Sequence, residues 1–293
     1  MIEIQFQHKY DAKRLYTFLN QLLDMESSPS YMIQKEDTYA VRIECMVHDE
    51  KERFIKWVQE SICQYILKIK LNDWFKEILS TNYHYRDEVE QQQIIDIIHS
   101  VLEGKNEELA VFLPKFGIKD YIMDQMGQWL QEHKIFSFDS FMTFRLRTLL
   151  NELRKYVDLS LDEYRMEQEY QMFIQMLRDF LIGREPKMER LHLLFEDEKI
   201  TFFDEDFMEI RRSELAKMVD RKLLINHPIY IDSNTIAPLL SIAPKKIFLY
   251  SSDHDQPIIR TVRNIFEERL RVENTCTFEE IKHSLNNKKY NTP

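Results

Sequence analysis

Hydrophobic and polar positions follow three successive patterns along the chain. A period of two residues alternates with a helical period up to about residue 75, a helical period dominates to residue 182, and the period of two returns after Pro186. We therefore divide the sequence into an N-terminal α/β unit over residues 1–80, a helical middle over 81–185 and an α/β region over 186–293. The order of these elements predicts an α+β fold.

The N-terminal unit is predicted to have the order βαββα. Residues 2–6 alternate between apolar and polar, and residues 11–23 carry apolar side chains at helical spacing. Residues 31–33 and 39–47 are rich in β-branched and aromatic side chains, which predicts a pair of strands. Residues 49–69 begin with an aspartate and a glutamate at the spacing of a capping box, followed by an apolar stripe that predicts the second helix.

The middle region is predicted to be helical. Apolar stripes at helical spacing occur over residues 94–102, 121–130, 138–150 and 160–182. Gly183 and Pro186 follow the last stripe, and a glycine followed by a proline commonly marks the end of a helix.

The C-terminal region is predicted to be a mixed α/β layer. It opens with a hairpin of residues 191–195 and 200–203, whose connection over 196–199 lacks the usual Asn-Gly or Asp-Gly pair. The remaining predicted elements are helices over 214–224 and 235–242, the second opened by Asp232 and Ser233, a strand over 247–250, a helix that starts near Pro257 and a short strand over 270–272.

The scarcity of glycine removes several classes of enzyme. Only 4 of the 293 residues are glycine. A phosphate-binding P-loop needs two glycines at fixed spacing, a dinucleotide fingerprint needs three, and a nucleophile elbow needs two around its serine. None of these patterns is present, and all four glycines lie between residues 104 and 183, so neither flanking α/β region has the glycine of a phosphate-cradling loop.

Charge and cysteine content indicate an acidic protein of a reducing compartment. The chain has 50 acidic and 40 basic residues, so nucleic-acid binding would require a local basic patch and is not expected. Three widely separated cysteines, Cys45, Cys63 and Cys276, favour a reduced, cytoplasmic setting. We see neither a signal peptide nor an apolar stretch that would span a membrane.

Two groups of residues resemble metal sites. Cys45 and His48 have a Cys-x-x-His spacing, but these two positions face opposite sides of a strand, so we favour packing at a strand end. A group of carboxylates has no EF-hand glycine, and we expect it to be solvated. This group comprises Glu196, Asp197, Glu198, Asp204, Glu205, Asp206 and Glu209. We therefore predict no metal-binding residue.

The loop Asp253-His254-Asp255 is the first alternative site. It follows the predicted strand over 247–250 at its carboxyl end, where open α/β sheets bind ligands, and His254 between two aspartates could serve acid–base chemistry. Lys245 and Lys246 are expected nearby, where they would attract an anion. The competing interpretation, which we favour, is that Asp255 is the N-cap of the next helix.

A basic helix is the second alternative site. Arg145, Arg147, Arg154 and Lys155 are interleaved with Phe141 and Phe144, as on a nucleic-acid-binding surface. We favour a solvated basic face with both aromatic side chains on the core stripe, because acidic residues lie on the same helix.

The order of segments from about residue 135 to 275 is recognisable. The segments are SFDSFMTFRLRTLL, EYRMEQEYQMFIQMLRDFL, REPKMERLHLLFEDEKITFFDEDFMEI, NTIAPLLSIAPKKIFLYSS and IIRTVRNIFEERLRV. They resemble the YtxC-like family of sporulation proteins. The resemblance implies a cytosolic, sporulation-associated protein of an endospore-forming bacterium and supplies no reaction. It also implies a cysteine-containing stretch after the last strand, where this chain has only Cys276.

Together, these observations lead us to expect a non-enzymatic role in binding a protein partner. No catalytic or cofactor-binding residue is predicted, because no complete catalytic constellation is present. Two alternatives stay open. One is a small-ligand-binding protein or enzyme that uses the Asp253-His254-Asp255 loop, and the other is a nucleic-acid-binding regulator that uses the helix from Arg145 to Lys155.

Overall fold

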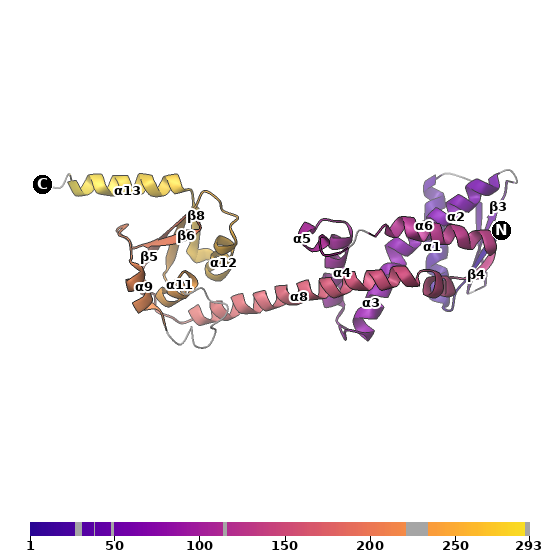
Figure 1. Ribbon diagram of the computed structural model, residues 1–293, viewed down its shortest axis with the longest axis horizontal. Helices are drawn as coiled ribbons and strands as arrows, with labels where there is room; N and C mark the ends of the chain where they lie inside the picture. Colours follow the sequence, from indigo (N-terminus) through magenta and orange to yellow (C-terminus); the bar gives the residue numbers. More distant parts are fainter. Residues whose placement is uncertain (27–30, 38, 48–49, 114–115, 221–233, 291–293) are drawn as a thin grey trace. The chain divides into compact units, whose positions relative to one another are not determined.

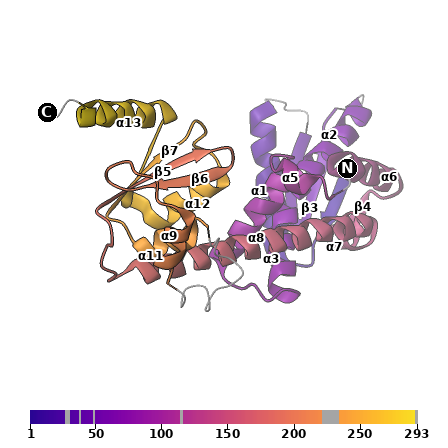
Figure 2. The same ribbon diagram turned by 60° about the vertical axis from the view of Figure 1, so that its left-hand side comes forward.

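The chain forms two compact units, each with its own four-stranded sheet (Figure 1, Figure 2). A computed structural model describes residues 1–26, 31–37, 39–47, 50–113, 116–220 and 234–290. Unit 1 spans Met1–Met166 and unit 2 spans Glu167–Pro293. The predicted α+β class is confirmed. The boundary predicted after residue 80 lies inside unit 1, and the boundary predicted after residue 185 lies inside unit 2.

Unit 1 contains a mixed sheet with the strand order β2-β3-β1-β4. The strands are β1 (Ile2–Gln5), β2 (Tyr31–Asp37), β3 (Ala40–Cys45) and β4 (Ile135–Ser137). β1 pairs antiparallel with β3 and parallel with β4. The first three strands are those of the predicted βαββα unit. The middle region is not wholly helical, because it contributes β4, which has only three residues and is too short for a recognisable period of two.

The helices of unit 1 share one hydrophobic core with its sheet. They are α1 (Lys9–Glu26), α2 (Lys51–Tyr65), the π-helical turn η2 (Ile66–Lys70), α3 (Leu71–Thr81), α4 (Glu88–Leu102), α5 (Glu107–Ala110), α6 (Ile118–Glu132), α7 (Phe138–Ser140), the π-helical turn η3 (Phe141–Arg145) and α8 (Arg147–Leu181). α8 continues from unit 1 into unit 2 and ends before Gly183, whose φ of +73° confirms the predicted helix stop.

The helix starts differ in how their free N–H groups are satisfied. The N-cap of α2 is Glu50, which makes no side-chain capping bond. Asp49, the first residue of the predicted capping box, lies outside the described residues. The N-cap of α4 is Asp87, whose carboxylate accepts hydrogen bonds from the N–H groups of Val89 at 2.9 Å and Glu90 at 3.0 Å. Such a cap stabilises a helix by about 1 kcal/mol.

Unit 2 contains a mixed sheet with the strand order β6-β5-β7-β8. The strands are β5 (Arg190–Glu196), β6 (Lys199–Phe203), β7 (Lys246–Tyr250) and β8 (Leu270–Glu273), and all four match predicted strands. β5 pairs antiparallel with β6 and parallel with β7. The β5–β6 turn has φ values of +49° at Asp197 and +59° at Glu198, which is the left-handed backbone of a type I′ turn built without glycine.

Four helices and one 3₁₀ turn begin within the described residues of unit 2. They are α9 (Arg212–Met218), α11 (Ile236–Ile242), α12 (Pro257–Phe266), the 3₁₀ turn η4 (Glu267–Arg269) and α13 (Thr275–Tyr290). α9 ends before the predicted residue 224, and the predicted opening residues Asp232 and Ser233 lie outside the described chain. Among the helices that the structure describes, none has an apolar stretch long enough to cross a membrane.

A small aromatic cluster lies on the α13 side of this sheet. Phe203, Phe207, Tyr250 and Phe278 are all buried there. His192 lies among them, with its ring centroid 4.1 Å from that of Phe207. α13 reaches the cluster through Phe278 and Ile281, and the C-terminal end of the helix extends past the sheet (Figure 1).

Candidate functional site

The residues that resemble metal sites serve local structure. Cys45 is the last residue of β3, and its Sγ lies 3.0 Å from the backbone oxygen of Val47; His48 is outside the described chain. In the carboxylate group, Asp204 accepts backbone N–H bonds from Asp206 and Met208, both at 2.9 Å. Over the described residues, no three His, Cys, Asp or Glu side chains are arranged to hold a metal ion.

The Asp253-His254-Asp255 loop forms an exposed turn in front of α12. The carboxylate of Asp253 accepts hydrogen bonds from the backbone N–H of Asp255 at 3.0 Å and from the Gln256 side chain at 2.8 Å, and these bonds lower the pKa of Asp253. The N-cap of α12 is Gln256, so the N-cap predicted at Asp255 is wrong by one residue. A ring nitrogen of His254 lies 3.1 Å from the Ser251 carbonyl.

The two lysines expected beside this loop lie elsewhere. Lys246 is the first residue of β7, whereas the loop follows the last residue of that strand, so strand β7 separates them. Lys245 forms an ion pair with Glu189 at 2.5 Å. The structure therefore does not bring these lysines together with Asp253 and Asp255 to form an anion site.

The basic residues from Arg145 to Lys155 divide into two pairs. Arg145 lies over the ring of Trp129, 4.9 Å from its centroid, and Lys155 forms an ion pair with Glu152 at 2.8 Å. Arg147 and Arg154, in contrast, are exposed, and neither has an ion-pair partner among the described residues. Both line a groove in unit 1.

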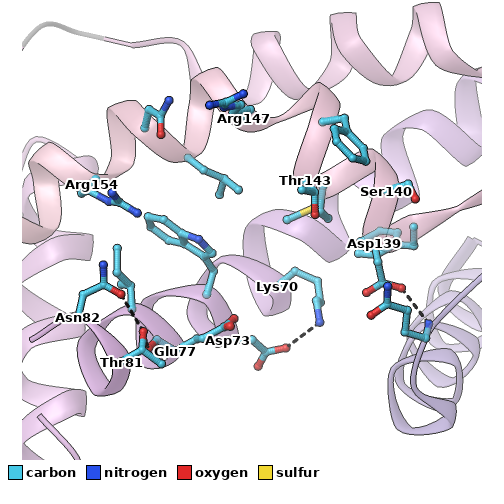
Figure 3. A pocket seen from close by; sticks show the side chains of 18 residues that line it. Lys70, Asp73, Glu77, Thr81, Asn82, Asp139, Ser140, Thr143, Arg147 and Arg154 are labelled. Atoms are coloured by element: carbon cyan, nitrogen blue, oxygen red, sulfur yellow. Dashed lines mark hydrogen bonds and ion pairs between the residues drawn. The ribbon is translucent and has the colours of Figure 1, made fainter. Parts of the chain in front are cut away.

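This groove has a volume of about 680 Å³ and lies between α3 on one side and α7, η3 and the start of α8 on the other (Figure 3). We call it the α3–α8 groove. Its apolar lining comprises Trp74, Ile78, Phe138, Met142, Phe144 and Leu150. Its charged lining comprises Lys70, Asp73, Glu77, Asp139, Arg147 and Arg154. A groove of this size and mixed character falls within the range of ligand-binding sites.

Phe144 corrects one of the predictions. Phe141 is fully buried, as expected from the core stripe, but the side chain of Phe144 is 74% exposed and lines the groove. Large exposed apolar side chains are common singly, but Phe144 lies beside two arginines that have no ion-pair partner in the described chain, and it adds contact area for a ligand.

Two π-helical turns explain which side chains reach the groove. Buried positions in an α-helix recur every three or four residues, but Ile66 is followed on the core side by Leu71, and Phe141 by Leu146. In each π-turn the later residue of the pair donates its N–H to the carbonyl five residues before it, Leu71 to Ile66 and Leu146 to Phe141. The extra residue keeps both leucines in the core. Lys70 and Phe144, which lie within these turns, line the groove, and π-turns often occur at functional sites.

Some charged side chains of the groove form ion pairs or hydrogen bonds with described residues, and others do not. Lys70 binds Asp11 at 3.0 Å and Asp73 at 3.4 Å, and Asp139 accepts the backbone N–H of Gln7 at 2.9 Å. Arg147 and Arg154 lie on the α8 side, across the groove from Asp73 and Glu77 on α3 (Figure 3). The positive charge that no carboxylate of the described residues pairs with is therefore concentrated along α8.

The side chains of the groove can bind a ligand that has charged and apolar groups. Arginine side chains bind carboxylates and phosphates through paired hydrogen bonds, and the indole of Trp74 and the ring of Phe144 offer apolar contact. Sequence reasoning missed the α3 side of the groove. The five-residue steps from 66 to 71 and from 141 to 146 in the apolar pattern are a signal for it.

Comparisons with known proteins agree with the family resemblance. The model of the YtxC-like family matches residues 56–271, which include every lining residue of the α3–α8 groove except Gln7. The chain is 32% identical over 272 residues to "Uncharacterized protein YtxC" from Bacillus subtilis, over 93% of this chain and 94% of that protein. No solved structure matches the chain.

Proposed function

The chain belongs to the YtxC-like family, and from this membership and the α3–α8 groove we propose a non-enzymatic role in sporulation, in which unit 1 binds a segment of a partner protein. The observation that carries the proposal is the pair Arg147 and Arg154, which line an open groove beside the exposed Phe144 without ion-pair partners among the described residues. Arginine and aromatic side chains are enriched in protein interfaces, where they provide most of the binding energy.

The charge of the whole groove favours a protein over a nucleic acid. Three basic and three acidic side chains line it, so it has no net formal charge. A polyphosphate backbone would meet Asp73, Glu77 and Asp139 as well as the arginines, whereas binding of a nucleic acid depends on a continuous positive track. A protein segment can place charges of both signs opposite both sides of the groove.

A site-specific crosslink tests the binding role. Phe144 is replaced by photoreactive benzoylphenylalanine in sporulating cells, and Phe112 is replaced in the same way as the control. Both side chains are 74% exposed in unit 1, but only Phe144 lines the groove. We expect a discrete protein adduct from position 144, reproduced with the purified partner. Adduct formation at position 144 no greater than at position 112 would contradict the proposal.

The proposed role in sporulation has a separate test. Deletion of the gene in the host should lower the yield, resistance or germination of spores, and complementation with the intact gene should restore it. Normal values for all three in the deletion strain would refute this part of the proposal.

We also propose that the protein acts in the cytoplasm. Cys45, Cys63 and Cys276 are all free thiols in the structure, and unpaired cysteines are usual in a reducing compartment. A fluorescent fusion is expected to fill the cytoplasm of the mother cell or the forespore, and a signal confined to the exterior of the cell would be the contrary result.

A further inference from the structure

Resting on the proposed function, we infer that the segment bound in the α3–α8 groove is acidic, with two carboxylates about 10 Å apart that pair with Arg147 and Arg154. The inference adds the chemistry of the partner to the general binding role.

Arg147 and Arg154 differ from Lys70, Arg145 and Lys155 in having no carboxylate partner among the described residues. Lys70 has two carboxylate partners, Arg145 pairs with Glu132 at 3.4 Å, and Lys155 pairs with Glu152 at 2.8 Å. Arg147 and Arg154 are exposed and have no carboxylate within ion-pair distance among the described residues, although both line the groove. The α8 side of the groove therefore has two guanidinium groups that can pair with carboxylates of a bound segment.

The helix sets the distance between these two points. Arg147 and Arg154 lie seven residues apart in the regular part of α8, which corresponds to about 10 Å along the helix axis. Carboxylates that match this distance and share one face lie seven residues apart in a helix. Arginine can bind each carboxylate through two parallel hydrogen bonds, which fixes the register of the segment.

The opposite side of the groove gives the segment an orientation. Glu77 on α3 has no ion-pair partner among the described side chains, and Asp73 also lies on this helix. Acidic side chains of the segment would be repelled from α3, so they are expected to face α8. An apolar side chain of the segment would then contact Phe144 or Trp74, which belong to the apolar lining of the groove.

Charge reversal in the full-length protein tests the inference. The Arg147→Glu/Arg154→Glu variant is compared with the Arg53→Glu/Arg86→Glu variant, which has the same net charge but reverses two exposed arginines outside the groove lining. Each variant carries benzoylphenylalanine at position 144, and tryptophan fluorescence confirms that unit 1 is folded. The first variant should lose adduct by about tenfold or more, because like charges across an interface repel, and the second should retain it.

The sequence of the crosslinked segment completes the test. We expect two carboxylates seven residues apart, and their replacement by lysine should restore the adduct with the Arg147→Glu/Arg154→Glu variant. An adduct that persists after charge reversal overturns the acidic partner but leaves the proposed function intact. Absence of an adduct at position 144 overturns the proposed function itself, and an adduct that nuclease removes overturns both by identifying a nucleic acid.

Discussion

Protonation of His192 is expected to destabilise unit 2. Only 6% of this residue is exposed, and its Nδ1 lies 3.0 Å from the hydroxyl of Tyr250. Burial lowers the pKa of His192 to about 4; the positive charge of Arg190 adds to this effect, whereas Asp204 and Glu205 oppose it. The neutral imidazole is therefore the form that the folded unit accommodates.

The pKa difference gives the size and the sign of the effect. Since the pKa of His192 is lower in the folded state than its ordinary value of 6.5, the unfolded chain binds the proton first as the pH falls. The contribution to stability is complete above pH 6.5 and is lost as the pH falls towards 4. A difference from 6.5 to about 4 corresponds to about 3 kcal/mol in total, of which about 2 kcal/mol is lost between pH 7.5 and pH 5.

Hydrogen exchange can measure this loss in the full-length protein. Trp57, Trp74 and Trp129 all lie in unit 1, so tryptophan fluorescence does not report on unit 2. Mass spectrometry of peptides from β7, corrected for the intrinsic exchange rate, gives the free energy of opening of unit 2 between pH 5 and 7.5. The His192→Phe variant keeps an aromatic ring at this position and removes the titration of His192.

The comparison of the two proteins isolates the histidine. Between pH 7.5 and 5, the opening free energy of β7 should fall by about 2 kcal/mol more in the wild type than in His192→Phe. The pH dependence of unit 1, followed by tryptophan fluorescence, should be the same in both. Equal pH dependence of β7 in the two proteins would refute the assignment of a neutral, buried His192.

Three further predictions concern unit 1 and the thiols. Deletion of Thr143 should be tolerated, because it removes the extra residue of a π-turn. Deletion of Asn151 should unfold unit 1, because it rotates the following core residues about the axis of α8 by about 100°. An equal loss of unfolding free energy in the two variants, measured by urea titration, would contradict this reasoning. Cys276, which is exposed, should react with a thiol reagent at pH 8, whereas Cys63, whose pKa burial raises to about 11, should react only on unfolding. Asp87→Ala should lower the unfolding free energy by about 1 kcal/mol, with Asp87→Asn close to the wild type.

Much of the fold follows from the sequence, because long apolar patterns reflect burial. The βαββα order, the hairpin of unit 2 and the end of α8 at Gly183 all match their predictions. β4 was not predicted because three residues carry too little pattern, and its place in the sheet depends on pairing with β1. α13 was not predicted because the helix buries little apart from Phe278 and so has no apolar stripe.

Only the α8 side of the α3–α8 groove can be predicted from the sequence. Arg147 and Arg154 could be identified as basic residues of one helix, but the sequence does not show that Arg145 stacks on Trp129. Regular helical spacing predicts a core position for Phe144, but the π-turn η3 changes the spacing and leaves this side chain exposed. The contribution of α3 arises from tertiary packing, which local periodicity does not encode.

The glycine-free turn between β5 and β6 has a practical consequence for protein engineering. Asp197 and Glu198 both have left-handed φ values, a conformation that costs an L-residue other than asparagine or aspartate about 1 kcal/mol and glycine almost nothing. The Asp197→Asn/Glu198→Gly variant would have the preferred sequence for this turn. It should therefore be more stable than the natural chain, and it offers a starting protein for crystallisation in which the residues of the α3–α8 groove are unchanged.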